Sequence, residues 1–431
     1  MEFRTFQIPG TATHALRIKA PAQEQASRQP VHFIALVDTS GSMDGENRLI
    51  NVVASLTFML EHLTATDYLT VITFSTSATV AVTTTQLLPG AKTAIAQTLQ
   101  GLVASGNTNL SAAILLARDC LASALLAGIP ATKTGILILT DGHANTGLIG
   151  EAELAALLAP VAATGTTVST IGYGTEHNSA LLTQMATAGS GSYNVVNNVE
   201  DTASCIGDII GGLLSCVAQN VVVEYPAGTT FETSYNVSCA AAAAAAEPTK
   251  RVTIGDVLAE SDIYIISSAA ATSVRGHLLP AGTAFAAEPV PAAEPAPAEL
   301  QAAVAARIRH EVAGFLREAA AGRASASAAA RIRTSIHAQM ADAPDNPIWQ
   351  ILLNQLADVE HTSPAADPGL TTIFHQRATS IGLGRGLISG SSAVTSPFAN
   401  HTQRHISTYL HSHVSQAQDP HEYESVHTSS I

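Results

Sequence analysis

The chain has 431 residues, of which 46% are hydrophobic and only 13% are charged, a composition that predicts packed globular domains and excludes a largely disordered protein. Its formal net charge of -14 at pH 7 disfavours nucleic acids and anionic membranes as partners, because both carry the same sign of charge. The length favours two or three domains rather than one.

The N-terminal segment lacks the apolar stretch of a signal peptide, and the chain has no uninterrupted apolar run long enough for a transmembrane helix. We therefore expect an intracellular, cytoplasmic protein. The four cysteines, Cys120, Cys205, Cys216 and Cys239, include no CxxC pair. Cys205 and Cys216 are expected on one helix, roughly 16 Å apart, which is too far for a disulfide. The pattern favours free thiols in a reducing compartment.

From residue 31 onward, short apolar runs alternate with longer segments of helical periodicity. The expected strands are 31–37, 68–75, 79–86, 135–140, 166–174 and 192–199. The expected helices are 48–63, 90–102, 110–126, 151–165, 179–190 and 201–218. This alternation predicts an α/β domain over residues 31–218, with a doubly wound, mostly parallel sheet covered by helices on both faces.

Segments rich in β-branched and aromatic residues flank the predicted α/β domain on both sides. Residues 1–30 and 219–286 are expected to form one β-sandwich, with the α/β domain inserted into it. A proline-rich linker is expected at 287–299, followed by a helical bundle over 300–360. Residues 361–431 are rich in serine, threonine and histidine, and we expect this tail to be partly disordered.

Polar residues follow the two most apolar strands. Asp38, Ser40 and Ser42 come directly after the first of them, Asp141 follows the second, and Thr108 lies in a turn before a helix. Because ligands of open α/β sheets bind at the carboxyl ends of the strands, we expect these five side chains to converge. Two carboxylates and three hydroxyls form an oxygen-only set, which suits Mg²⁺, with Mn²⁺ or Ca²⁺ as alternatives, and disfavours zinc.

The predicted ligand set has a functional consequence. Neutral hydroxyls leave at most two protein negative charges on the metal, so a bound dication would remain electrophilic on its exposed side. An acidic side chain of a partner protein would fit that open position. The alternative is a vestigial site that only caps loops. Asp44 and Glu46 would tune the site, bind a second cation or, more simply, form a solvated first helical turn.

The motifs Asp-x-Ser-x-Ser (38–42), Gly-Asn-Thr-Asn (106–109) and Leu-Thr-Asp-Gly (139–142) resemble the metal-ion-dependent adhesion site of von Willebrand factor A (VWA) domains. The resemblance covers about residues 31–218, and Asn107 stands where a second glycine is common. It implies a Rossmann-like fold with all five usual metal-ligand positions present. The β-strands and helices that follow resemble the intracellular type of VWA protein, with a β-sandwich and a helical extension.

The chain contains no P-loop, HExxH or GxSxG motif, so we expect a protein that is not an enzyme. The leading hypothesis is a module that captures an acidic residue of a protein partner through bound Mg²⁺. Two hypotheses from other classes stay open. One is an accessory subunit of an ATPase- or ubiquitin-linked enzyme complex, and the other is a structural assembly protein. The sequence does not determine the oligomeric state.

Overall fold

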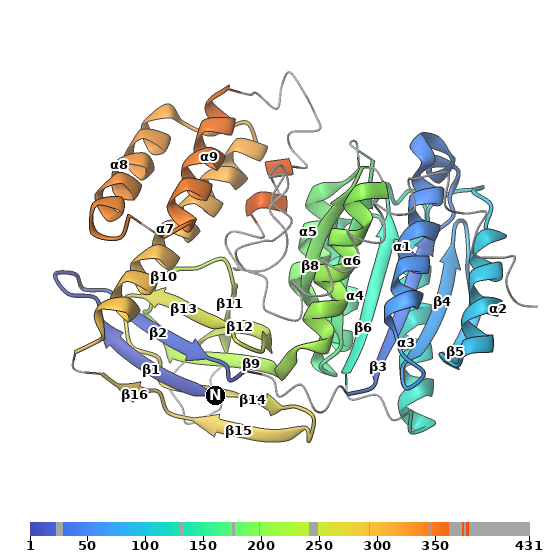
Figure 1. The fold of residues 1–431 in the computed structure, drawn as a ribbon, viewed down its shortest axis with the longest axis horizontal. Coiled ribbons are helices and arrows are strands. Elements are labelled where there is room, and N and C mark those ends of the chain that lie inside the picture. The colour runs from blue at the N-terminus through green and yellow to red at the C-terminus, as the bar shows by residue number, and fades with distance from the viewer. Residues whose placement is uncertain are drawn as a thin grey trace, which may run out of the picture.

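The structure is a computed structural model, which describes residues 1–22, 29–129, 133–174, 177–197, 199–240, 249–292, 294–344, 346–361, 373, 374 and 376–378. The described residues form an α/β region, a β-sandwich and a group of helices (Figure 1). The predicted tail, 361–431, lies almost wholly outside the described residues. No helix in the described ranges is both long and apolar enough to span a bilayer.

The α/β region alternates strands and helices. Its strands are β3 (Val31–Asp38), β4 (Tyr68–Phe74), β5 (Ala78–Gln86), β6 (Lys133–Thr140), β7 (Thr167–Tyr173) and β8 (Ser190–Val196). Its helices are the 3₁₀ helix η1 (Gly41–Asn47) and α1 (Arg48–His62), α2 (Pro89–Gln100), α3 (Leu110–Leu126), α4 (Glu151–Ala163), α5 (Ser179–Ala188) and α6 (Val199–Leu214). Among the described residues the strands form one sheet in the order β5-β4-β3-β6-β7-β8, with β5 antiparallel to its neighbour. The predicted fold class is confirmed.

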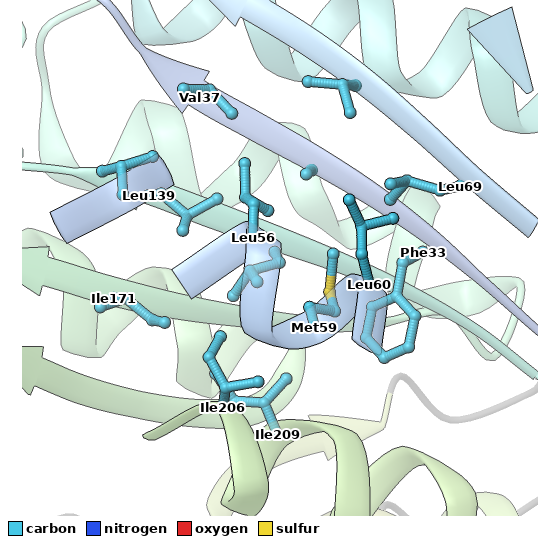
Figure 2. Close-up of a cluster of buried hydrophobic side chains, with 14 of the residues drawn as sticks. Phe33, Val37, Leu56, Met59, Leu60, Leu69, Leu139, Ile171, Ile206 and Ile209 are labelled. Carbon is cyan, nitrogen blue, oxygen red and sulfur yellow. The ribbon is translucent and has the colours of Figure 1, made fainter. Parts of the chain in front are cut away.

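Helices cover both faces of this sheet. On one face, α1, α2 and α6 pack against the strands, and Figure 2 shows part of this core, including Leu56, Met59, Phe33, Leu139 and Ile206. On the other face, α3, α4 and α5 pack against a second apolar cluster. Because both faces are buried, β3 is buried at every one of its residues.

The strand order places a topological switch point between β3 and β6. From the central strand β3 the chain continues to β4 on one side, and it later returns to the other side of β3 as β6. The loops after β3 and β6 therefore leave the same edge of the sheet toward opposite sides. Open α/β sheets bind their ligands at this position.

Two further sheets form the β-sandwich. One contains β1 (Glu2–Gln7), β2 (His14–Lys19), β10 (Phe231–Glu232), β13 (Asp262–Ser267) and β16 (Val290–Pro291). The other contains β9 (Cys216–Pro226), β11 (Asn236–Ala240), β12 (Thr249–Leu258), β14 (Ser273–Leu278) and β15 (Thr283–Ala287). Leu16 and Ile18 of β2 share one apolar core with Val221 and Val223 of β9. Strands from both sides of the α/β region thus build one sandwich.

Two predictions about these segments are wrong. Residues 287–299 are not only a linker, because β16 pairs with β1 and the next helix begins at Pro297. Proline suits an edge strand and a first helical turn, since neither position requires its N–H group. Cys216 does not share a helix with Cys205, because α6 ends before Cys216, which begins β9. All four cysteines lie within the described residues and are free thiols.

The C-terminal helices are α7 (Pro297–Ala320), α8 (Ala326–Asp342) and α9 (Ile348–His361). An ion-pair network fixes the start of α7 on the sandwich. The carboxylate of Glu299, which is 6% exposed, lies 2.5 Å from the Arg17 guanidinium and 2.7 Å from that of Arg4. Ala303 and Ala306, one and two turns further on, pack against the same sheet.

A buried ion pair joins the α/β region to the sandwich. Lys133, the first residue of β6, is 3% exposed, and its Nζ lies 2.7 Å from Oδ1 of Asp256 in β12. The ammonium also donates to the Gly165 carbonyl at 2.5 Å and to Gln219 Oε1 at 3.3 Å. The Thr167 hydroxyl donates to the other Asp256 oxygen. Because each charge has several partners, the network holds the two regions in a defined orientation.

We expect Lys133→Met to lower the free energy of unfolding by about 3 kcal/mol or more, because Asp256 would remain buried without its cation. The double variant Lys133→Met/Asp256→Asn should be less destabilised, since it removes both charges and keeps an acceptor for Thr167. Urea denaturation followed by circular dichroism measures both variants. Wild-type stability of the single variant would contradict this role for the ion pair.

Candidate functional site

Three loops meet at the carboxyl edge of the α/β sheet. Gly41, after β3, donates its N–H to the carbonyl of Gly106, in the loop before α3, at 2.9 Å. Gly106 has a φ of 81°, and a Cβ there would lie 2.8 Å from the Thr76 hydroxyl oxygen. Only glycine tolerates both this backbone conformation and this close approach. The loop that carries Thr108 is therefore held against the loop after β3.

Asp38 ends β3 and is completely buried. Its Oδ1 accepts a hydrogen bond from the Ser40 N–H at 2.8 Å, and its Oδ2 accepts one from the Thr140 hydroxyl at 2.5 Å. The bond from Thr140 to Asp38 ties the ends of β3 and β6 together, and the Thr140 oxygen also accepts from the Gly142 N–H at 2.9 Å. Burial raises the pKa of Asp38 to about 6; hydrogen bonds from Thr140 and Ser40 oppose this rise, and the charge of Asp141 adds to it.

The predicted hydroxyls come from two of the loops. The Oγ atoms of Ser40 and Ser42 lie 3.1 Å apart, and Ser42 is exposed. Thr108 is buried, and its N–H donates to Asn145 Oδ1 at 2.9 Å, while its carbonyl accepts from the Asn145 N–H at 3.1 Å. Among the described residues, none forms a hydrogen bond with the Thr108 hydroxyl. That oxygen is therefore available to a ligand.

Asp141 follows β6 and is also completely buried. Its Oδ1 accepts from the His143 N–H at 3.3 Å, and its Oδ2 lies 3.2 Å from Nη1 of Arg48. The same Nη1 donates to the Ser42 carbonyl at 3.3 Å, and Nη2 lies 3.0 Å from Glu46 Oε2. One guanidinium thus bridges two of the predicted site residues and an acidic neighbour.

Sequence reasoning missed Arg48, although the sequence holds a signal for it. Arg48 is the first residue of α1, where the positive end of the helix dipole disfavours a cation. A cation in such a place indicates a specific anionic partner. The interpretation of Glu46 as part of a regular first helical turn is wrong, because Glu46 lies before α1 with a left-handed φ of 53°.

The loop after β7 also contacts Asp141, through the backbone. Asn178 donates its N–H to the Asp141 carbonyl at 3.0 Å. The neighbouring His177 donates from Nδ1 to the Gly174 carbonyl at 2.7 Å, so its Nε2 accepts from the Tyr193 hydroxyl at 2.5 Å. Burial lowers the pKa of His177 to about 4, which keeps the ring neutral at pH 7. The histidine acts here as a structural brace.

The donor set at this edge has the chemistry of a site for a hard cation. The two carboxylates are close enough that the charge of Asp141 raises the pKa of Asp38, and a dication would offset this repulsion. In the described ranges no group of three or more His, Cys, Asp or Glu side chains could hold a metal. A metal ion bound at this edge would therefore require the hydroxyls as well as the carboxylates.

The α/β region has a known family. Residues 33–210 match the von Willebrand factor type A domain. The chain contains a VWA domain. A solved von Willebrand factor type A protein from Catenulispora acidiphila has a TM-score of 0.56 at 17% identity, over 79% of this chain and 87% of that one. The ArnB paralog VWA2 from Sulfolobus acidocaldarius has a TM-score of 0.54 at 14% identity, over 88% and 97%. At such identities the likeness shows the fold.

Two curated relatives are both described as uncharacterized. YfbK of Escherichia coli (strain K12) is 24% identical over 223 residues, which are 51% of this chain and 38% of the relative. The protein sll0103 of Synechocystis sp. (strain ATCC 27184 / PCC 6803 / Kazusa) is 30% identical over 191 residues, which are 44% of this chain and 43% of the relative. The chain thus spans about two fifths of the length of these relatives.

Without metal, Asp38→Asn should be more stable than the wild type at pH 8, by on the order of 2 kcal/mol; it should lose about half of this advantage by about pH 5 and the rest only as the pH falls to about 4. Folding raises the pKa of Asp38 from 3.8 to about 6. The folded state therefore binds the proton more tightly than the unfolded state does. The cost of the buried charge is fully present above about pH 6, decreases as the pH falls below that value, and is absent only below the unfolded pKa of 3.8.

The stability of Asp38→Asn must be compared with that of the wild type at each pH. Three buried histidines, present in both proteins, titrate in the same range and have the opposite effect on stability. Burial lowers the pKa of His32 and of His177 to about 4 and that of His310 to about 3, so the fold loses stability as the pH falls below 6.5. Thermal unfolding of both proteins from about pH 8 to 4 with a chelator measures the difference. A difference that does not change with pH would contradict the prediction.

Proposed function

We propose that the protein is a divalent-metal-dependent interaction module, which captures an acidic residue of a partner protein. Asp38, Ser40, Ser42, Thr108 and Asp141 would hold the metal, with Mg²⁺ as the expected ion and Mn²⁺ or Ca²⁺ as alternatives. The observation that carries the proposal is the meeting of two buried carboxylates with the three hydroxyl-bearing residues on joined loops of the VWA domain. A bound dication would supply an electrophilic centre for the partner's carboxylate.

The charge balance of the site supports this proposal. Asp38 and Asp141 together neutralise one dication, and the three hydroxyl ligands add no charge. Arg48 and Glu46 form an ion pair at 3.0 Å and offset one another. The loaded site would therefore carry no excess negative charge that repels an incoming carboxylate. The module would bind its partner without a catalytic step.

Exposed apolar side chains support a protein as the partner. Ile50, Val103, Leu148 and Ile149 are 63%, 76%, 41% and 60% exposed. They lie in the first turn of α1, in the α2–α3 loop and in the β6–α4 loop, the segments that also border or carry the site residues. Large apolar side chains around a polar centre are typical of protein contact surfaces.

Thr108→Val should weaken the binding of Mg²⁺ or Mn²⁺ by at least about tenfold, the loss that follows when even an outer partner of a metal ligand is removed. Its stability without metal should match the wild type, because the substitution keeps the shape of a side chain whose hydroxyl has no hydrogen-bond partner among the described residues. Isothermal titration calorimetry measures the affinity. Thr146→Val, in the neighbouring loop, is the matched control and should bind metal as the wild type does.

The capture of a partner should depend on the metal. Proteins recovered on the immobilised chain in Mg²⁺ should be lost in EDTA and on the Thr108→Val variant, but retained on Thr146→Val. Changing one acidic residue of the recovered partner to its amide should then abolish binding. Equal recovery under all four conditions would contradict the proposal and favour a structural assembly protein.

A further inference from the structure

We propose that Arg48 is a built-in cation that competes with the divalent metal for Asp141 and thereby sets the metal affinity of the site. The inference rests on the proposed function and concerns the regulation of the same site. Arg48 belongs to neither the Asp-x-Ser-x-Ser motif nor the other two loops that carry the predicted ligands. It nevertheless contacts residues of two of those segments.

The guanidinium occupies a confined position. Its Nη1 lies 3.2 Å from Oδ2 of Asp141 and 3.3 Å from the Ser42 carbonyl oxygen, and both residues belong to the predicted metal set. The side chain is only 12% exposed, and its buried Nε has no hydrogen-bond partner in the part of the chain that the structure describes. Gly174 closes this position, because a Cβ there would lie 2.7 Å from Glu46 Oε2 and 2.8 Å from Arg48 Nε. Arg48 is thus confined at the edge of the candidate site.

A cation in this position opposes the metal for two reasons. Its hydrogen bond to Asp141 occupies one oxygen of a proposed ligand. Its positive charge also repels the dication, and the low exposure of both groups limits screening by solvent and salt. An arginine keeps its charge at all physiological pH values, so the competition does not depend on protonation.

Glu46 offers the guanidinium a second anion. Its carboxylate is 55% exposed and lies 3.0 Å from Nη2 of Arg48, whereas Asp141 is fully buried. The left-handed backbone of Glu46 and Asn47, with φ of 53° and 55°, brings that carboxylate back toward the start of α1. When a metal binds Asp141, Glu46 would hold the displaced charge of Arg48. The pair therefore makes metal binding weaker without preventing it.

This arrangement couples the metal to the partner. The partner's carboxylate adds a negative charge beside the dication and offsets the repulsion from Arg48. Each ligand should therefore raise the affinity of the site for the other, as thermodynamic linkage requires. A site tuned in this way would fill with metal mainly when a partner is present.

Calorimetric titration of the full chain with Mn²⁺ alone, and then with Mg²⁺, tests the inference. Arg48→Met should bind the metal more tightly, on the order of tenfold, and Arg48→Lys, which keeps the charge, should stay near the wild type. Without metal, Asp141 would be buried without its counter-ion in Arg48→Met. This variant should therefore melt at a lower temperature than the wild type and gain more from the same metal concentration.

Glu46→Gln should change the metal affinity in the opposite direction to Arg48→Met. Glu46 is exposed, so this substitution does not threaten folding. The substitution removes the carboxylate of Glu46, so that the Arg48 guanidinium keeps its ion pair with Asp141. It should therefore weaken metal binding several-fold. If Glu46 acts through Arg48, its effect should largely disappear in the double variant Arg48→Met/Glu46→Gln. An equal effect of Glu46→Gln in both backgrounds would overturn that link.

The outcomes separate this inference from the proposed function. If the wild type binds metal and Arg48→Met binds it equally or more weakly, Arg48 orients Asp141 instead of competing for it, and the inference fails. If neither protein binds metal, the proposed function itself fails. If only Arg48→Met binds measurably, both proposals are supported.

Discussion

The burial of two carboxylates at the ends of adjacent apolar strands is the constraint on which the site depends. β3 and β6 are covered by helices on both faces, so their backbones are fixed by the core. That packing carries Asp38 and Asp141 into positions without access to solvent. Buried carboxylates must find compensation, and at this edge they find it in N–H groups, the Thr140 hydroxyl and Arg48.

The charges of Asp38 and Asp141 are compensated unequally, and this difference affects how the site would bind a metal. Asp141 has a guanidinium partner, whereas the donors to Asp38 among the described residues are all neutral, and burial raises the pKa of Asp38. A dication next to both would relieve the uncompensated charge of Asp38 and compete with the existing partner of Asp141. Metal affinity in the proposed site is therefore a balance between a favourable and an unfavourable contact.

The three regions of the chain are joined by ion pairs of the same buried kind. Lys133 and Asp256 link the VWA domain to the sandwich at the edge opposite the candidate site, and Glu299 links the sandwich to α7 through Arg17. Such pairs add modest stability but disfavour other orientations of the regions, because separating the two partners would leave a buried charge without its counter-ion. They would suit the proposed interaction module, because they hold the edge that carries the candidate site in a fixed orientation.

Local sequence patterns were enough to predict much of the fold, because apolar periodicity and strand-end motifs are properties of neighbouring residues. The sequence by itself determined the alternation of strands and helices in the α/β region, the four polar positions after β3 and β6, and the hydroxyl of Thr108 in the turn before α3. It could not determine that Arg48 pairs with a residue 93 positions away, that Pro291 belongs to a strand, or that Ser273–Leu278 and Thr283–Ala287 complete a sheet. Those features depend on partners distant in sequence, so only the tertiary structure decided them.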